Sequence, residues 1–452
     1  MRLCDAVELS RGDIVALVGA GGKTTAMYRL AHELSDDGWR VVATTTTMIY
    51  PPSQEQSQAL IVEPDPDVAL RRVEHALHAG GIATLVSRRL EGQGKLQGID
   101  PNLLPALGQL ADAVIVEADG AKGKSLKAPA AHEPVLPAAT TVLVPLVGID
   151  AVGHTLDEAT AHRPELVASL TGHALGDIIT SPLVATLLAH PRGALKGAPS
   201  SARVMPLLNK VEDAQSLATG REIAHCLRSA LRIERVLLGA VQARDPIVEC
   251  RRRVSAIVLA AGSATRFGRP KQLLPLAGGT LIEHVLHTLH ASGLFETIVV
   301  LGHAAQHIAP YIPTWCQVVD NPDWAQGISS SIRSGLKAIS PAAQAVLLVL
   351  ADQPRIRSEH IDQILQAYYG TSQSIVVPFH QGQRGTPVLF DRRHFAALAS
   401  LPGDVGGRQL IAQLPHQVLA VELPSAGLFL DIDTPTDYEQ LFDHSDDTGA
   451  GV

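Results

Sequence analysis

Residues 258–275 read V-L-A-A-G-S-A-T-R-F-G-R-P-K-Q-L-L-P, and this stretch decides how the second half of the chain folds. The apolar run that enters it, residues 255–259, predicts a buried strand. The strand opens into a loop whose small residues let backbone amides approach phosphate groups closely. Two cations of this loop, Arg266 and Lys271, are expected to bind a triphosphate from different sides.

Acidic residues follow two further apolar segments of this half. Residues 345–350 predict a strand that runs into A-D-Q-P, which places Asp352 where a Mg²⁺ that bridges phosphates would be held. Asp431 and Asp433 are two residues apart and share one face of an extended segment. We expect Asp352, together with Asp433, to hold Mg²⁺ or Mn²⁺. The alternative is that these carboxylates only cap the turn and the helix that follow them.

A polar loop at residues 321–331 reads N-P-D-W-A-Q-G-I-S-S-S and leads into a predicted helix. Its glycine and serines are suited to hydrogen-bond the base and ribose of a nucleotide, and the helix N-terminus adds positive potential. The serines alternatively only cap the helix. The nucleotide-binding residues expected in this half, besides the two cations, are Ala260, Ala261, Gly262, Gly327 and Ser331.

A second glycine-rich loop lies near the start of the chain, where residues 19–25 read G-A-G-G-K-T-T. It follows a predicted strand and precedes a predicted helix, which is the order that a phosphate-binding loop requires. The loop is shorter than the standard form, because the first glycine lies three positions, rather than five, before the glycine that precedes the lysine. Lys23 would neutralise phosphates and Thr24 would ligate Mg²⁺, or Thr24 only caps the helix. The nucleotide-binding residues expected here are Gly19, Gly21, Gly22, Lys23, Thr24 and Thr25.

Further polar residues of the first half follow strands. Glu117 and Asp119 come after the apolar segment 113–116 and are expected to contact a metal or a substrate, although carboxylates there also cap helices. Four threonines at residues 44–47 are equally consistent with contact to phosphate or metal and with residues that only favour strand structure. Asn209 begins an N-K-V-E sequence that resembles the base-reading N-K-x-D loop, but its glutamate is a methylene too long, so GTP is not assigned.

The chain has 452 residues, 46% of them hydrophobic and 18% charged, which is typical of two or three folded domains. Apolar segments of the first half alternate with helical segments such as 68–78 and 221–232, which predicts a parallel sheet covered by helices. We therefore predict an α/β fold with two domains, an N-terminal P-loop-type parallel α/β sheet and a C-terminal Rossmann-like α/β fold. The expected boundaries are 1–245 for the first domain, 246–253 for a linker, 254–443 for the second domain and 444–452 for a disordered tail.

Composition excludes several classes of protein. The net charge is −8 and the longest basic run is residues 251–253, so a nucleic-acid partner is not expected. The four cysteines are scattered, which argues against disulfides and zinc and favours a reducing compartment. No apolar run approaches the roughly 18 residues of a membrane span, and the acidic N-terminus is unlike a signal peptide. We expect a cytoplasmic protein without membrane partners.

The first half resembles the YqeC family, which is described as a selenium cofactor biosynthesis or selenium-dependent molybdenum hydroxylase accessory protein. The resemblance spans about residues 10–240 and implies a pathway more than a reaction. It rests on the glycine-rich loop and, in order, on the threonine run at 44–47, E-A-D-G-A-K-G at 117–123, L-K-A-P at 126–129, H-E-P at 132–134, H-R-P-E at 162–165 and L-N-K-V at 208–211.

The second half resembles the MobA-like nucleotidyltransferases, and within them the molybdenum cofactor cytidylyltransferase branch. The superfamily signature is L-A-A-G-x-x-x-R-x-G-x-x-K, which begins at Leu259 and ends at Lys271. The branch is favoured by N-P-D-W at 321–324, A-D-Q-P at 351–354, R-G-T-P at 384–387, Gly403, Asp404 and Arg408, and D-I-D-T-P at 431–435.

The resemblance implies transfer of CMP from CTP to a molybdopterin-type cofactor, with Arg266, Lys271 and Asp352 as catalytic residues. The first half would add an NTP-dependent accessory activity, with ATP or GTP as its nucleotide, and a molybdenum hydroxylase apoenzyme is a candidate partner. Two alternatives stay open from the residues alone. One is a nucleotide-gated carrier or maturation module, and the other is a nucleotidyltransferase that uses GTP or another phosphorylated small molecule.

Overall fold

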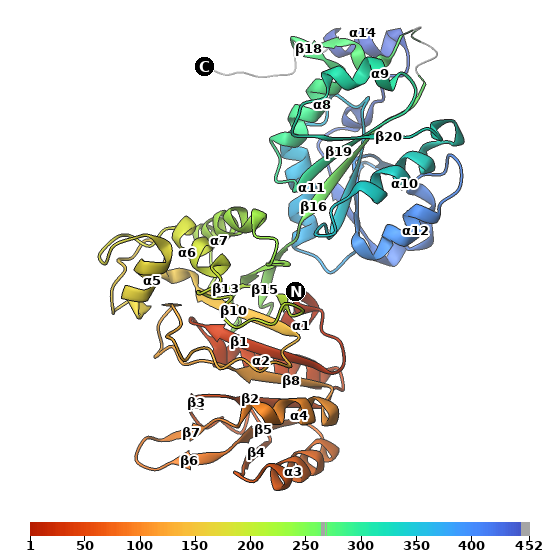
Figure 1. Cartoon of the computed structure of the whole chain (residues 1–452). Helices are drawn as coiled ribbons and strands as arrows, with labels where there is room; N and C mark the ends of the chain where they lie inside the picture. The colour runs from red at the N-terminus through yellow and green to blue at the C-terminus, as the bar shows by residue number, and fades with distance from the viewer. Residues whose placement is uncertain (264–266, 268, 444–452) are drawn as a thin grey trace. The chain divides into compact units, whose positions relative to one another are not determined.

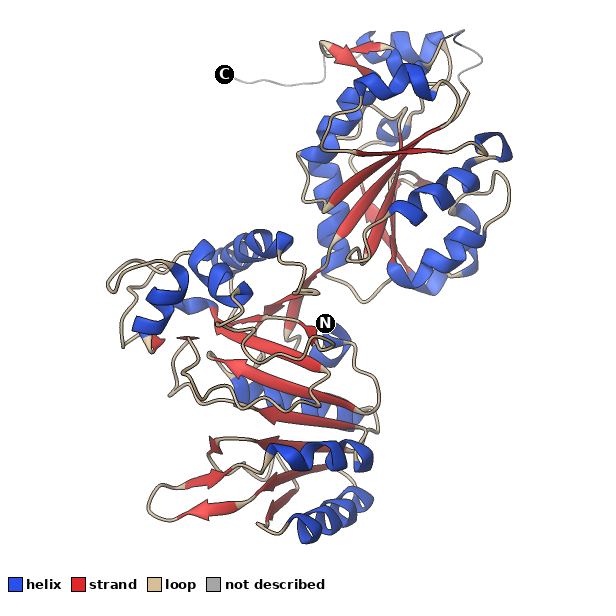
Figure 2. Cartoon of the chain, viewed as in Figure 1, coloured by secondary structure: helices blue, strands red, loops and turns tan. Residues whose placement is uncertain are grey.

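The computed structural model describes residues 1–263, 267 and 269–443 of the chain. It contains two compact units, Met1–Arg251 and Arg252–Val452 (Figure 1). In each unit a central sheet carries helices on both faces, which confirms the predicted α/β class (Figure 2). Arg266 and the predicted tail, residues 444–452, lie outside the described residues. No helix in the described ranges combines the length and apolarity that a membrane span requires.

Unit 1 is built on a ten-stranded sheet with the order β15-β14-β13-β10-β1-β8-β2-β5-β4, with β12 also paired to β10. All these pairings are parallel except that of β14 with β15. Strand β1 lies between β10 and β8 although β2 follows it in the chain, so the strand order reverses at β1. Ligands of such sheets bind at this reversal, beyond the carboxyl ends of the strands.

The strands of this sheet are β1 (Asp13–Gly19), β2 (Val41–Thr45), β4 (Ala59–Val62), β5 (Ile82–Val86), β8 (Ala113–Glu117), β10 (Val142–Gly148), β12 (Arg203–Val204), β13 (Leu207–Asn209), β14 (Val236–Gly239) and β15 (Ile247–Arg251). Two small sheets complete the unit and are formed by β3 (Met48–Ile49), β7 (Lys95–Gln97) and β6 (Arg88–Leu90), and by β9 (Leu126–Lys127) and β11 (Ala161–His162).

Alternate residues of β1 point to opposite faces of the sheet, and both faces are covered. Val15 and Leu17 pack with α1 and α2, whereas Ala16 and Val18 pack with α5, α6 and α7. Ile14 lies on the same face as Ala16 and Val18 and packs with α3 and α4. This double burial explains why β1 is apolar throughout. The helices are α1 (Leu3–Val7), α2 (Lys23–Asp36), α3 (Pro66–Ala79), α4 (Leu104–Leu110), α5 (Pro164–Thr171), α6 (Ser181–Ala189) and α7 (Ala214–Cys226).

Two expectations for unit 1 need correction. Most of the segment predicted as a linker, residues 246–253, forms β15, which pairs antiparallel with β14 and buries Ile247 and Cys250. The Asp-Pro and arginine residues around it hid this short strand. The helix predicted at 221–232 runs instead from Ala214 to Cys226, because Asp213 and Ser216 form a capping box that starts it earlier.

Unit 2 has an eight-stranded mixed sheet with the order β20-β19-β16-β21-β24-β22-β23, and β25 pairs with β22. Strand β16 lies between the parallel strands β19 and β21, so the order reverses here too. Strand β24 is antiparallel to both β21 and β22. The strands are β16 (Val254–Ala260), β19 (Glu296–Leu301), β20 (Gln317–Asp320), β21 (Ala345–Leu350), β22 (Ile375–His380), β23 (Gln383–Arg384), β24 (Val388–Asp391) and β25 (Val418–Glu422), with a hairpin of β17 (Pro275–Leu276) and β18 (Gly279–Thr280).

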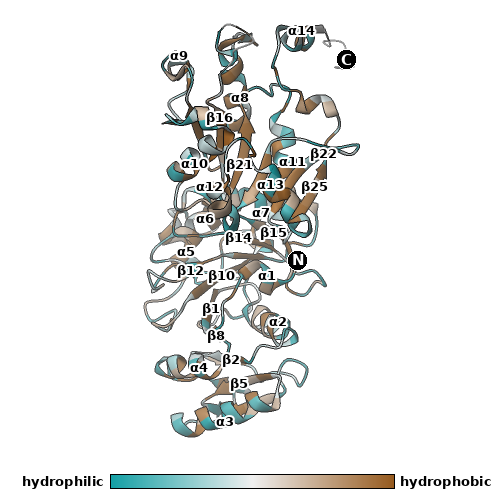
Figure 3. Ribbon diagram, turned by 90° about the vertical axis from the view of Figure 1, so that its right-hand side faces the viewer, coloured by the Kyte–Doolittle hydropathy of each residue, from teal (hydrophilic) through white to brown (hydrophobic). Residues whose placement is uncertain are grey.

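Helices cover both faces of the second sheet, whose strands β16 and β21 are strongly hydrophobic (Figure 3). Helices α8 and α11 share one apolar cluster with β16, and α10, α12 and α13 pack on the other face. The helices are α8 (Leu281–His290), α9 (Ala305–Ile308), α10 (Ile328–Ala338), α11 (Ser358–Tyr369), α12 (Phe395–Ser400), α13 (Arg408–Gln413) and α14 (Pro435–Asp443).

Candidate functional site

The polar residues predicted in unit 2 meet at the carboxyl ends of β16 and β21. Lys271 opens a short 3₁₀ turn after the glycine loop, and Asp352 stands two residues beyond the end of β21. The Lys271 Nζ atom is 2.5 Å from Asp352 Oδ2 and 2.9 Å from Asp433 Oδ1. Three residues separated by up to 162 positions in the sequence are therefore brought together around one ammonium group.

The two carboxylates keep this lysine charged. Burial alone would lower the pKa of Lys271, but the negative charges of Asp352 and Asp433 outweigh it and raise that pKa above its ordinary value. Among the described residues, the second oxygen of Asp352, Oδ1, is buried and has no hydrogen-bond partner. A buried carboxylate oxygen without a donor is costly unless a cation or a ligand completes it.

Gln353 belongs to the same site, although no role was predicted for this residue. Its Nε2 atom donates to Asp431 Oδ1 at 2.8 Å and to the Phe429 carbonyl at 3.3 Å. Its Oε1 atom accepts a hydrogen bond from Thr386 Oγ1 at 2.6 Å. Burial, and then the charge of Asp352, raise the pKa of Asp431. The only signal for Gln353 was its place in A-D-Q-P directly after Asp352.

The start of the glycine loop is tightly packed. Ala260 and Ala261 are buried, and the Ala261 carbonyl accepts a hydrogen bond from the His303 amide at 3.0 Å. Gly262 differs from them, because a Cβ atom added to it would meet no described atom within 4 Å. Contact of Gly262 with phosphate stays a prediction.

Gly327 and Ser331, predicted to bind nucleotide, have packing contacts at the start of α10. A Cβ atom on Gly327 would lie 2.8 Å from the backbone carbon of Gly403, so glycine is required there. The Ser331 hydroxyl accepts a hydrogen bond from Asn321 Nδ2 at 3.0 Å. The carboxylate of Asp404 accepts the Ile328 amide at the first turn of this helix. Nucleotide contact by either residue stays a prediction.

In unit 1 the glycine-rich loop joins β1 to α2, as predicted. Lys23 is buried; its Nζ atom donates to the Gly19 carbonyl at 2.6 Å and lies 3.3 Å from Asp119 Oδ1. The Thr24 hydroxyl donates to Glu117 Oε2 at 2.7 Å. Burial raises the pKa of Glu117, although the positive charge of Lys23 opposes this shift. Thr25 is half-buried in the first turn of α2.

The glycines of this loop are required by close contacts. A Cβ atom on Gly21 would lie 2.2 Å from the Gly148 amide nitrogen, and one on Gly19 would lie 2.4 Å from the Leu146 carbonyl oxygen. Asn209 Nδ2 donates to the Gly21 carbonyl at 2.7 Å, so this residue supports the loop. The resemblance of its N-K-V-E sequence to a base-reading loop is thus explained by a structural role in this chain.

Asp119 is held by a network of alternating charges. Its Oδ2 atom accepts from the Gly19 amide at 3.1 Å and pairs with Lys127 Nζ at 2.8 Å. Lys127 also pairs with Glu133 at 2.8 Å, and Glu133 pairs with Arg163 at 2.6 Å. The contacts of Asp119 are those of an anchor for the loop. Metal binding by Glu117 and Asp119 stays a prediction.

The threonine run at residues 44–47 is tied into the fold. The Thr44 hydroxyl donates to the Leu85 carbonyl, and the Thr45 hydroxyl donates to the Glu117 carbonyl. The Thr46 hydroxyl donates to the Val135 carbonyl. These contacts favour the structural interpretation of the run over phosphate binding.

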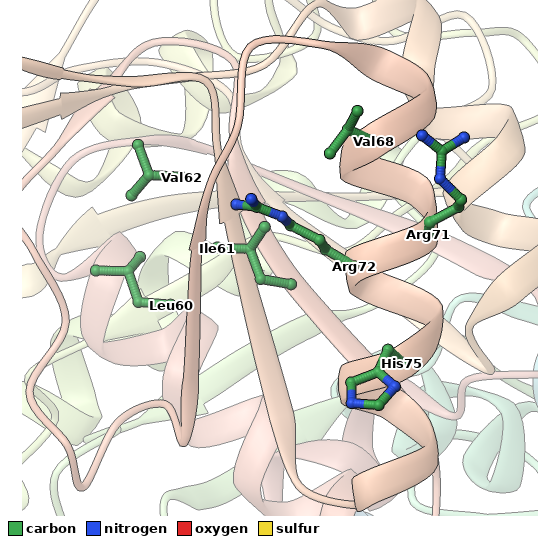
Figure 4. A pocket seen from close by; sticks show the side chains of 7 residues that line it. All are labelled: Leu60, Ile61, Val62, Val68, Arg71, Arg72 and His75. Carbon is green, nitrogen blue, oxygen red and sulfur yellow. The ribbon is translucent and has the colours of Figure 1, made fainter.

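The groove and the cavity described next do not identify a further binding site. A groove of about 430 Å³ lies between β4 and α3, and Arg72 extends across it (Figure 4). A cavity of about 20 Å³, room for roughly one water molecule, borders Gly19, Asp119 and Lys127. No group of three or more His, Cys, Asp or Glu side chains suited to a metal occurs among the described residues. The groove is lined by Leu60, Ile61, Val62, Val68, Arg71, Arg72 and His75.

The two units match different protein families. Residues 15–165 match the model of the YqeC protein family, and residues 256–418 match the MobA-like NTP transferase domain. The chain is 29% identical over 239 residues to the uncharacterized protein YqeC of Escherichia coli K12, covering 52% of this chain and 91% of that protein.

Two enzymes resemble a smaller part of the chain. Nicotine blue oxidoreductase of Paenarthrobacter nicotinovorans is 32% identical over 206 residues, covering 42% of this chain and 95% of that protein. The molybdenum cofactor cytidylyltransferase of Escherichia coli K12 is 26% identical over 188 residues, covering 41% of this chain and 93% of that protein.

Proposed function

Because its second half belongs to the MobA-like NTP transferase family and is a nucleotidyltransferase, we propose that this chain transfers CMP from CTP to a molybdopterin-type cofactor. The choice of CTP and of this acceptor rests on the similarity to the molybdenum cofactor cytidylyltransferase. The site that would carry the reaction is Lys271 with Asp352 and Asp433, at the carboxyl ends of β16 and β21.

In this reaction a phosphate oxygen of the acceptor attacks the α-phosphorus of CTP. A new P–O bond forms, the bond between the α-phosphorus and its bridging oxygen breaks, and pyrophosphate leaves. Both reactants are anionic, so alignment and charge neutralisation dominate, and no covalent nucleophile is needed. Lys271 would stabilise the charge that grows on the α-phosphate, and Arg266, outside the described residues, is proposed to bind the β- and γ-phosphates.

Asp352 and Asp433 would hold a divalent cation. They fit one, because both already bind a positive charge, and Asp352 Oδ1 is buried without a hydrogen-bond partner among the described residues. Mg²⁺ commonly takes one or two carboxylates and fills its remaining positions with phosphate oxygens and water. When bound, Mg²⁺ or Mn²⁺ would neutralise charge on the phosphates. The two aspartates would hold it, and Lys271 would then turn from them to the nucleotide.

For unit 1 we propose a nucleotide-dependent accessory activity for selenium-dependent molybdenum hydroxylases. The loop of residues 19–25 would bind the phosphates of ATP or GTP. Thr24 and Glu117, already joined by a hydrogen bond, would hold the accompanying Mg²⁺. A hydroxylase apoenzyme is the proposed protein partner.

The test of the main proposal measures pyrophosphate release by the full chain from CTP and from GTP, with molybdenum cofactor present. We expect release from CTP only, together with formation of the cytosine dinucleotide. Preference for GTP would overturn the nucleotide assignment. Turnover with methylerythritol phosphate in place of the molybdenum cofactor would overturn the acceptor assignment.

A nucleotide-gated carrier is the second candidate for unit 1. It is favoured by the pairing of Lys23 with Asp119, since phosphate binding would have to pull this lysine from a buried partner and so couple binding to a conformational change. Residues 1–251, with ATP or GTP, distinguish the candidates: a carrier binds nucleotide and releases no phosphate, whereas an NTP-dependent enzyme releases it. Failure to bind any nucleotide would contradict both.

A further inference from the structure

The two carboxylates of the unit 2 site stand on segments of different kinds. Asp352 lies two residues beyond the end of β21, a central strand of the sheet. Asp433 lies beyond a 3₁₀ turn that ends at Phe429, in residues that belong to no strand. Without a sheet ladder, the separation of the two carboxylates depends on the contacts that tie the 429–433 segment to the end of β21.

Besides Lys271, which pairs with both carboxylates, three hydrogen bonds join the two segments directly. The Ile432 amide donates to the Asp352 carbonyl at 3.0 Å, and Gln353 donates from its side chain to Phe429 and to Asp431. The Asp433 amide is held from the other side by the Asp437 carboxylate at 3.1 Å. Two of the three hydrogen bonds to the segment that follows β21 therefore come from one side chain.

Gln353 has little freedom to do anything else. The residue is 5% exposed, and both polar atoms of its amide have partners. Thr386 donates to the amide oxygen at 2.6 Å, which fixes the amide orientation and directs the nitrogen at the 429–433 segment. An amide suits this position better than a carboxylate, because Asp431 accepts from it and Asp352 and Asp433 lie close by.

We propose that Gln353 is a positioning residue that sets the separation of Asp352 and Asp433 and thereby the affinity of the site for a divalent cation. Gln353 touches neither nucleotide nor acceptor in this scheme; it acts through Asp431 and the backbone of the 429–433 segment. The inference rests on the metal role proposed for the two aspartates. Partners that orient metal ligands typically change affinity about 10–100-fold when they are removed.

The probe is Mn²⁺, titrated into the full chain in the presence of CTP and followed by electron paramagnetic resonance of the free ion. Asp352→Asn removes a ligand of this site, so the Mn²⁺ binding that this variant loses is the part that belongs to the site. Any Mn²⁺ that the variant still binds, for example in unit 1, is subtracted. Gln353→Met keeps the side-chain volume and removes both hydrogen-bonding groups. We expect it to weaken that part of the Mn²⁺ binding about tenfold or more. Thr386→Val, which only releases the amide oxygen, should weaken it by a smaller factor.

The matched control is Tyr368→Phe, which removes another buried hydrogen bond of unit 2, from the Tyr368 hydroxyl to Asp391 at 2.7 Å. It should alter stability but leave Mn²⁺ affinity unchanged. Parent-like Mn²⁺ affinity in Gln353→Met, or in Thr386→Val where the first variant does not fold, would overturn the positioning role. Parent-like affinity in Asp352→Asn would overturn the metal assignment and this inference with it, whatever the outcome of the CTP and GTP assay.

Discussion

Lys23 and Lys271 hold equivalent places in their units. Each follows the loop that leaves the strand at which the sheet order reverses, β1 or β16. Each is paired with an aspartate two residues beyond the end of the neighbouring parallel strand, Asp119 after β8 and Asp352 after β21. In both units, the proposed phosphate binding would thus compete with an internal carboxylate for the lysine.

Removal of either partner in unit 2 should abolish most of the chemistry. Lys271→Ala and Asp352→Ala are each expected to lower the turnover of nucleotidyl transfer by about 10²–10³, the usual effect of losing one electrostatic group at a transition state. Initial-rate assays with CTP and molybdenum cofactor measure this effect. The exposed Lys337 of α10 offers the control, and Lys337→Ala should keep the parent rate. A parent rate in either site variant would contradict the assignment.

Glu133 should make the stability of unit 1 depend on pH. Burial would raise its pKa, but Arg163 and Lys127 outweigh burial and lower the pKa to about 2. A lowered carboxyl pKa contributes stability above its unfolded value of 4.5, and this contribution is lost as pH falls towards 2. At neutral pH this contribution is worth roughly 3 kcal/mol.

Urea unfolding of Glu133→Gln against the parent chain checks this expectation. The difference in unfolding free energy should be largest near pH 7 and should shrink steadily below about pH 4.5. A difference that stays constant between pH 7 and pH 3 would show that the network of Lys127, Glu133 and Arg163 does not titrate in this way.

At the scale of elements, the turn between β1 and α2 packs closely against the backbone of β10. Gly21 has a φ of +85° and lies against Gly148, so a side chain there meets both strain and collision. Gly38, just beyond the end of α2, has a φ of +78° but a Cβ atom on it would meet nothing within 4 Å. Comparison of alanine substitutions at Gly21 and Gly38 therefore separates the destabilisation caused by the collision from that caused by the positive φ.

Gly21→Ala should therefore destabilise unit 1 by at least about 2 kcal/mol more than Gly38→Ala does. It should also abolish nucleotide binding, since the loop must shift away from β10, whereas Gly38→Ala should keep it. Chemical unfolding and nucleotide titration by calorimetry measure the two effects. Equal destabilisation by the two variants would mean that the loop relaxes without loss of structure.

The elements that were predicted well from the sequence are those with clear periodicity of hydrophobic residues or with a buried apolar run. Strands β1 and β16 were found from their apolar residues because both faces of each sheet are covered. Strand β15 was missed because only a few residues pair and its neighbours are charged. The bounds of α7 were missed because the Asp213–Ser216 capping box, and not the apolar pattern, sets its start.

At the scale of the whole chain, the units should fold separately if they are cut at the right residue. Strand β15 completes the sheet of unit 1: the Met1 amino group donates to the Ile247 carbonyl, and Arg221 pairs with the buried Glu249. A fragment of residues 1–251 should unfold cooperatively. A fragment of residues 1–245 loses β15 and exposes the edge of β14.

Thermal unfolding of the two fragments, followed by circular dichroism, tests this boundary. We expect the shorter fragment to melt about 5–10 °C lower, because Ile247 and Cys250 leave the core. Gel filtration should also show association through the exposed edge. Identical melting temperatures would mean that residues 246–251 do behave as a linker.

The sequence by itself determined the α/β class, the division into two halves and the family of the second half. It also singled out Lys271, Asp352 and Asp433 as candidate site residues. These follow from local patterns and motif spacing, which are visible along the chain. Only the tertiary structure decided that both aspartates bind one lysine, that Gln353 ties their segments together and that Asn209 supports a loop 188 positions away. Such contacts join residues far apart in the chain, and side-chain hydrogen bonds over that distance leave no periodic trace in a single sequence.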